Sequence, residues 1–225
     1  MKKIKLPVTG QNITTYSFEV ADELQSVLID TFTAWLNKVI ATGVHITDGQ
    51  VLTYGWTQIK CQVSQSHLQL LAPDGKTLPL QWSSDLTNVL DALVYHQFVP
   101  ESFGLVQDIP LLSDTVLVGE RFAEIPMFIT RSEKSGENDS HCGWFMASLA
   151  HDADIAAEEN LQIMSLYEAV VRAPHIFKYI SMPVGSQVVF ENKTPMFYYK
   201  SKLIEPIENS LVAAEQTIKD QTYVL

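Results

Sequence analysis

The sequence has only two cysteines, Cys61 and Cys142, and 80 residues lie between them. A disulfide framework is therefore implausible, and without a Cys-x-x-Cys pair a structural zinc site lacks its usual ligands. No apolar run approaches the roughly 20 residues that span a bilayer. The basic start MKKIKLPVTGQNITTYS is not followed by a continuous apolar stretch or a small-residue cleavage site. We therefore expect no signal peptide, no membrane partner and a cytoplasmic location.

Basic residues are also scarce. The chain has 15 lysines and arginines against 26 aspartates and glutamates, a net charge of −11. The acidic excess is spread evenly along the chain. Residues 1–115 contain 6 basic and 11 acidic residues, and residues 116–225 contain 9 basic and 15 acidic residues. Nucleic-acid binding needs a basic face to neutralise phosphates, so we exclude nucleic acid as a partner. The acidity favours attraction to a basic protein, although many soluble proteins are simply acidic.

The recurrent catalytic spacings are absent. There is no Walker phosphate loop, dinucleotide-binding glycine pattern, Gly-x-Ser-x-Gly elbow or His-Glu-x-x-His. His151, Asp152 and Asp154 have the atoms of metal ligands, but short polar runs of this kind more often form a solvated loop or cap a helix. His141 is poorly placed to activate Cys142, because neighbours on a strand point to opposite faces. We expect no catalytic residue, no metal site and no cofactor.

The clearest patterns that are present belong to secondary structure. Apolar residues recur at helical spacing in residues 21–43 and again in 83–99. Between them Ile59, Cys61 and Val63 alternate with polar residues, as in a strand with one face on a core. This order of helix, strands and helix predicts a first α+β domain over residues 1–105.

The second half shows a different order of elements. We predict two strands in 115–131, a core strand in 143–149, a helix over 154–174, a hairpin over 185–201 and a closing helix in 206–220. These form a second α+β domain over residues 115–225. The whole chain is then an α+β protein of antiparallel sheets flanked by amphipathic helices, arranged in two units.

The tract NDSHCGWFMASLAHDADIAAEEN, residues 138–160, combines polar, aromatic and acidic residues. Seven acidic residues and one lysine lie between Glu133 and Glu159. Trp144 belongs to an apolar strand, so we expect it to be a core residue and not an anchor for a partner. Cys142 is expected to be a small buried thiol beside Gly143.

A series of four ordered motifs begins inside this tract and continues to residue 190. They are Gly143-Trp144-Phe145, the acidic DADIAAEEN, APHIFKYI at 173–180 and MPVGSQVVF at 182–190. Over roughly residues 139–199 the chain resembles the bacterial immunity-protein family numbered 33, formerly catalogued as domain of unknown function 2185. His141-Cys142 stands where that family usually has Asp-Ser, and MASLAHD replaces its usual glycine-and-acid phrase. Residues 1–115 resemble no family that we recognise.

The resemblance implies an immunity protein, which is a non-catalytic inhibitor of a bacterial toxin delivered by type VI secretion or a related route. It would bind its cognate toxin in the cytoplasm and occlude the active site. We hypothesise that the toxin is basic and is contacted by Glu137, Asp139, His151, Asp152, Asp154, Glu158 and Glu159. A solvated face is the simpler alternative for these acids. Two other functions stay open: an effector adaptor or chaperone, and an enzyme that reverses a toxin's modification.

Overall fold

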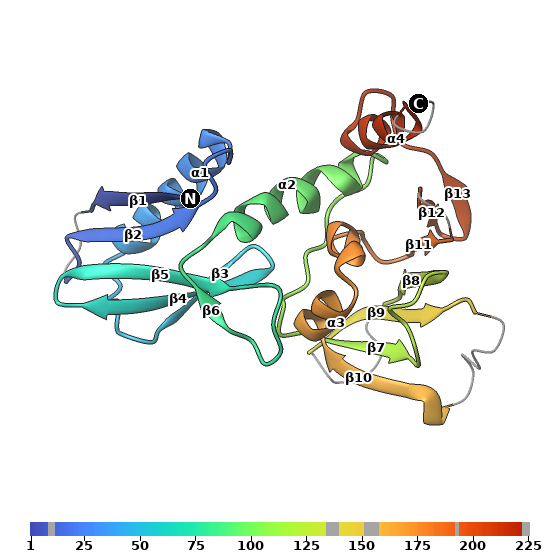
Figure 1. Cartoon of the computed structure of the whole chain (residues 1–225), viewed down its shortest axis with the longest axis horizontal. Coiled ribbons are helices and arrows are strands. Elements are labelled where there is room, and N and C mark those ends of the chain that lie inside the picture. The colour runs from blue at the N-terminus through green and yellow to red at the C-terminus, as the bar shows by residue number, and fades with distance from the viewer. Residues whose placement is uncertain (9–11, 134–139, 151–157, 192–193, 222–225) are drawn as a thin grey trace. The chain divides into compact units, whose positions relative to one another are not determined.

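The computed structural model describes residues 1–8, 12–133, 140–150, 158–191 and 194–221 (Figure 1). The chain forms two compact units, Met1–Leu93 and Val94–Leu225, and each contains its own sheet. Two sheets with accompanying helices confirm the α+β class. The limits expected for independent domains, 1–105 and 115–225, stay a prediction. Within the described ranges no helix is both long and apolar enough to cross a bilayer.

The first unit is built on a sheet with strand order β1-β2-β5-β4-β3, and β6 pairs with β5. Its elements are β1 (Lys2–Pro7), β2 (Thr15–Val20), α1 (Ser26–Ala41), β3 (Val51–Tyr54), β4 (Thr57–Ser64), β5 (His67–Pro73), β6 (Trp82–Ser83) and the start of α2 (Thr87–Glu101). The predicted helices and the strands between them are confirmed. Strands β1 and β2 were not predicted from the sequence.

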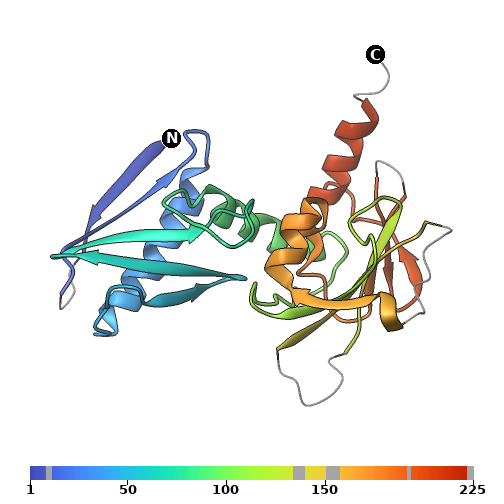
Figure 2. The same cartoon turned by 60° about the horizontal axis from the view of Figure 1, so that its bottom comes forward.

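The core of this unit lies between α1 and one face of the sheet (Figures 1 and 2). Helix α1 buries Ile29, Phe32, Leu36 and Ile40, which recur every three or four residues and so share one stripe. Phe32 meets Phe18 of β2 edge to face, with ring centroids 5.1 Å apart. Phe32, Leu36 and Ile40 are buried as their helical spacing predicted, whereas Val27, which shares that spacing, is 57% exposed.

The second unit contains a seven-stranded sheet with strand order β10-β7-β9-β8-β11-β12-β13. Its strands are β7 (Thr115–Gly119), β8 (Met127–Arg131), β9 (His141–Ser148), β10 (Leu161–Ser165), β11 (Ser186–Phe190), β12 (Met196–Tyr199) and β13 (Lys202–Ile204). Its helices are α3 (Leu166–Arg172) and α4 (Leu211–Gln221), with 3-10 turns η1 (Glu158–Asn160) and η2 (Pro174–Tyr179). The predicted strands, hairpin and closing helix are confirmed, whereas β13 was not predicted.

Two features of the sheets differ from the sequence-based expectation. Both sheets are mixed, because β2 runs parallel to β5 and β7 runs parallel to β9. The helix predicted over 154–174 is also wrong in part, since Leu161–Ser165 forms β10 and pairs with β7. The helix begins only at Leu166, where the Ser165 Oγ accepts the Glu168 N–H at 3.1 Å and caps its first turn.

Arg131, at the end of β8, is the polar centre of the second unit's core. Its side chain is 2% exposed, and its Nη2 lies 3.2 Å from the half-exposed carboxylate of Asp108. The guanidinium also donates to three backbone carbonyls: Nε to Cys142 at 3.1 Å, Nη1 to Met182 at 2.8 Å, and Nη1 to Asp108. Burial lowers the pKa of this group, and the Asp108 carboxylate opposes that effect. A single cation thus links three segments that are distant in sequence.

The motif residues that carry the resemblance surround this arginine. The Arg131 guanidinium lies 5.7 Å from the ring of Trp144, and the Trp144 indole donates to the Ile180 carbonyl at 2.9 Å. The Gly185 N–H donates to the Arg131 carbonyl at 2.8 Å. Gly143 has φ +84°, and a Cβ there would meet the Ser132 carbonyl oxygen at 2.2 Å, so only glycine fits. Trp144, fully buried, is the core residue that the sequence predicted.

Replacing Arg131 with methionine should destabilise the second unit by about 3 kcal/mol. Methionine fills much of the volume but leaves three inward-facing carbonyls without their donor. Urea unfolding measures the change, with Arg121→Met as the matched control. Arg121 forms an exposed ion pair with Glu124, so its loss should cost less than about 1 kcal/mol. Equal stability of Arg131→Met and the wild type would contradict the role given to Arg131.

His96, on α2, is a second buried polar group of this unit. It is fully buried, its Nε2 lies 3.1 Å from the Phe177 carbonyl oxygen, and its ring meets the Phe177 ring at 5.2 Å. Burial lowers the pKa of this imidazole from 6.5 to about 4. Between these values the unfolded chain binds a proton that the folded chain does not, so stability falls as the pH falls.

The contribution of His96 to this acid sensitivity should reach about 3 kcal/mol between pH 6.5 and pH 4. His96→Gln keeps a donor for the Phe177 carbonyl but cannot titrate in this range. Its free energy of unfolding should therefore decline less steeply than that of the wild type over the same window. Parallel pH curves for the two proteins, from denaturant unfolding at each pH, would show that His96 does not stay neutral in the fold.

Candidate partner-binding site

The residues predicted to contact a toxin lie mostly outside the described residues. This is true of Glu137, Asp139, His151, Asp152 and Asp154 and of the side chain of Glu158. Glu159 is described: it is exposed within η1, immediately before β10. The structure therefore fixes where the acidic tract rejoins the sheet but does not test its role.

The predicted contact residues form two groups, one on each side of β9 in the sequence. Residues 134–139 precede β9, whereas residues 151–157 follow it. Because β9 has eight residues, its two ends are separated by about 23 Å. The acids before β9 and those after it therefore leave the sheet from opposite ends of one strand.

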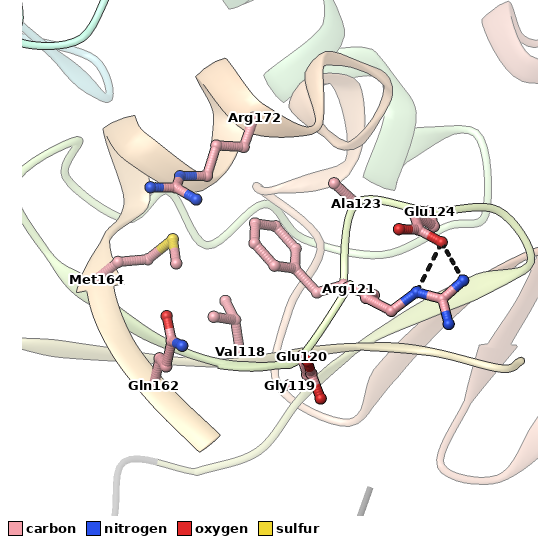
Figure 3. Close-up of a pocket in the computed structure, with 10 residues that line it drawn as sticks. Val118, Gly119, Glu120, Arg121, Ala123, Glu124, Gln162, Met164 and Arg172 are labelled. Carbon is pink, nitrogen blue, oxygen red and sulfur yellow. Dashed lines mark hydrogen bonds and ion pairs between the residues drawn. The ribbon is translucent and has the colours of Figure 1, made fainter. Parts of the chain in front are cut away.

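A pocket of about 220 Å³ lies beside β10, the strand with which the chain rejoins the sheet after residues 151–157 (Figure 3). Leu161, the first residue of β10, pairs with Gly119, the last residue of β7. The chain after β7 turns back over the sheet, and α3 supplies the opposite rim. The lining residues are Val118, Gly119, Glu120, Arg121, Phe122, Ala123, Glu124, Gln162, Met164 and Arg172.

The pocket has an apolar floor and a charged rim. Val118 and Phe122 are buried, and Met164 is half-buried beside them. In Figure 3 the Arg172 side chain extends over this floor from α3, while Arg121 turns toward Glu124. Arg172 pairs with Glu168 at 2.6 Å, and Arg121 with Glu124 at 2.6 Å. Such a site suits one side chain of a partner, with an apolar stem and a polar end.

A second hollow of about 360 Å³ lies at the other end of the same sheet. It is formed by β12, β13 and α4 and is lined by Thr194, Pro195, Met196, Phe197, Leu203, Ile204, Glu205 and Gln216. Leu203 of β13 is exposed beside this hollow, on the edge strand opposite β10.

Cys142 is a buried thiol, as predicted. Its residue is 1% exposed, its Sγ lies 3.4 Å from the Thr115 carbonyl oxygen, and burial raises its pKa. The neighbouring His141 uses Nδ1 to accept the Gly143 N–H at 2.9 Å. Cys61 is fully buried too, and burial raises its pKa to about 11. Both thiols are therefore held in the form that is a poor nucleophile.

Sequence spacing gave no sign of one serine–histidine contact in the first unit. Ser17 Oγ and His67 Nε2 are 2.9 Å apart across the parallel strands β2 and β5. The Ser17 hydroxyl donates to Gln69 Oε1 at 2.8 Å, so its oxygen accepts from His67. A nucleophilic serine must instead give its proton to the histidine. Thr15 Oγ1 lies 2.9 Å from His67 Nδ1 and completes a polar ladder between the strands.

The described part of the chain holds no cluster of three or more His, Cys, Asp or Glu side chains placed to bind a metal. The features that lie together in the described part of the second unit are the pocket and the edge strand β10.

Comparison with known proteins finds one family model that matches part of the chain. Residues 97–200 match the model of the Imm33-like domain. No curated protein and no solved structure matches the chain. The matched segment begins within α2 and ends just after β12, so it includes Arg131, the pocket and β10. The resemblance predicted over 139–199 is confirmed and extends further toward the N-terminus. Residues 97–200 of this chain are therefore similar to the Imm33-like domain.

Proposed function

We propose that this protein is an immunity protein that binds one cognate bacterial toxin in the cytoplasm and occludes its active site. The observation that carries this proposal is the match of residues 97–200 to the Imm33-like domain. A toxin is the partner class that an immunity-protein family implies. The toxin reaches the cell by type VI secretion or a related delivery route, and the inhibitor itself performs no chemistry.

The charge of the second unit supports a basic partner. Residues 94–225 contain 9 lysines and arginines and 18 aspartates and glutamates, so the net charge is 9 − 18 = −9. An acidic surface speeds the encounter with a basic protein and penalises pairing with another acidic one. The active site of a toxin that acts on an anionic substrate is a natural basic target for such a surface.

Protection inside a cell sets the required affinity. Almost every toxin molecule must be occupied at low concentration, which calls for dissociation constants on the order of 1 nM or tighter. An interface of roughly 1,600 Å² can reach this when a few buried anchors are surrounded by complementary charge. The pocket beside β10 offers a place for one such anchor, and the acidic segment before β10 offers the charge.

The proposed contact residues are Glu137, Asp139, His151, Asp152, Asp154, Glu158 and Glu159. The last five fall between β9 and β10, and Glu159 is exposed two residues before Leu161, the first paired residue of β10. They are therefore joined to the pocket through a short stretch of chain. We expect this group to contribute more to neutralisation than the acids that precede β9.

Reversing Asp152, Asp154 and Glu158 to lysine should abolish protection. The test co-expresses each variant with a domain from a neighbouring reading frame that is chosen because its expression alone stops growth, and it measures growth. Wild-type protein should restore growth, and the triple variant should fail to do so because lysines would repel a basic target. An adaptor would change secretion of the toxin without restoring growth.

The matched control reverses Glu191, Glu205 and Glu208, which are exposed and change the net charge by the same amount. This control should protect as well as the wild type. Full protection by the Asp152, Asp154 and Glu158 variant, with an unchanged unfolding curve, would remove this segment from the interface. Failure of the wild type to restore growth would overturn the immunity function itself.

A further inference from the structure

Strand β10 leaves one edge of the seven-stranded sheet without a neighbouring strand among the described residues (Figure 1). Its five residues, Leu161–Ser165, include no charge and no proline. Exposed edge strands usually carry charged residues or proline, because these residues prevent the free backbone groups of the edge from pairing with other chains. Strand β1, at the edge of the first unit's sheet, follows the rule with exposed Lys3 and Lys5. The edge at β10 is unprotected by comparison.

The hydrogen-bond register shows which backbone groups of β10 face outward. The Leu166 N–H donates to the Asp114 carbonyl at 2.7 Å, and these two residues continue the register of β10 and β7. In antiparallel pairs, hydrogen-bonded and non-bonded positions alternate. Met164 and Gln162 therefore share the bonded class with Leu166. The N–H and C=O of Ile163 are then directed away from β7, toward the free edge.

The side chain of Ile163 reinforces this edge. It is 69% exposed and lies directly opposite Leu117 on β7, which in turn lies beside Phe145 on β9. Phe145 meets Phe128 of β8 edge to face at 5.8 Å. These residues form an apolar row that runs inward from the edge on the face opposite Trp144. A side chain added next to Ile163 would extend that row.

The opposite face of β10 borders the pocket. Gln162 and Met164 alternate with Ile163 and line the pocket beneath Arg172 (Figure 3). A strand added to β10 would therefore place alternate side chains against the apolar row and beside the pocket. Strand addition works in this way: backbone bonds supply affinity, and pockets for alternate side chains supply specificity.

We propose that β10 is the docking edge for an extended segment of the toxin, which adds as a further strand to the seven-stranded sheet. This rests on the proposed function and names the contact that performs it. The segment carries an apolar residue beside Ile163 and lysine or arginine near Glu120 and Glu159, which are exposed at the start of β10.

Charge decides between a toxin segment and a second copy of this chain. Self-pairing through β10 would bring together two units whose net charge is 9 − 18 = −9 each. A strand of five residues buries too little surface to outweigh this repulsion, since stable interfaces bury roughly 1,200–2,000 Å². A basic segment instead gains from the same charge.

The test substitutes Ile163 in two ways and measures the Kd for the purified, catalytically inactivated toxin domain of the neighbouring reading frame. Ile163→Pro removes the outward N–H without breaking a bond to β7, as edge positions of this kind permit. Ile163→Thr keeps the N–H and removes apolar surface. The matched control, Leu203→Thr, replaces another exposed aliphatic side chain with threonine at a residue that is 56% exposed on the opposite edge strand, β13.

Ile163→Pro should raise the Kd at least about tenfold, Ile163→Thr by a smaller factor, and Leu203→Thr not at all. A second test measures amide hydrogen exchange in the wild-type protein and needs no substitution. Amide hydrogen exchange at Ile163 should be fast in the free protein and at least about tenfold slower in the complex.

Unchanged exchange at Ile163 in a complex that forms would overturn the docking edge while leaving the immunity function intact. So would wild-type affinity of Ile163→Pro. A free protein that sediments as a dimer, and as a monomer after Ile163→Pro, would assign the edge to a second copy instead. Absence of any binding between wild-type protein and the toxin domain would overturn the proposed function.

Discussion

The second unit is organised around one buried cation. Arg131 occupies the end of β8, and its guanidinium holds the carbonyls of Cys142, Met182 and Asp108, which come from three separate stretches of chain. Burying an arginine is unfavourable unless its donors find partners, so these carbonyls must be positioned together. The left-handed backbone at Gly143 and the Gly185 N–H that caps the Arg131 carbonyl provide that positioning. The arrangement of β8, β9 and the start of β11 follows from satisfying this one side chain.

The contacts of Arg131 give a structural role to the motifs that carry the family resemblance. Gly143, Trp144 and Met182 are buried around Arg131, and the Gly185 N–H donates to the Arg131 carbonyl. What the Imm33-like match identifies is therefore the scaffold of the domain. Specificity for one toxin would instead reside in parts that the scaffold holds in place: the acidic segment after β9, the pocket beneath Arg172 and the edge of β10. An inhibitor family can vary these surfaces while it keeps the same interior.

Periodicity predicted those elements whose burial is decided locally. The stripe of α1 and the alternation in β4 both follow from single stretches of sequence. Residues 161–165 show the limit, because Leu161 and Met164 fit a helical pattern as well as a strand, and only pairing with β7 decides between them. The tract containing Glu159 was recognised by its charge. The pocket and the exposed edge could not be predicted, since they arise where β7, β10 and α3 meet and no single segment encodes them.

One-to-one occupancy of the toxin is the mode of inhibition that we propose. It is tested most directly by titrating the purified chain into a fixed, known concentration of the active toxin domain, well above the Kd, and recording residual toxin activity. With one-to-one occupancy, residual activity should decline in a straight line, reach zero at one equivalent and stay there. Loss of all activity at a small fraction of an equivalent, increasing with incubation time, would show turnover and contradict it.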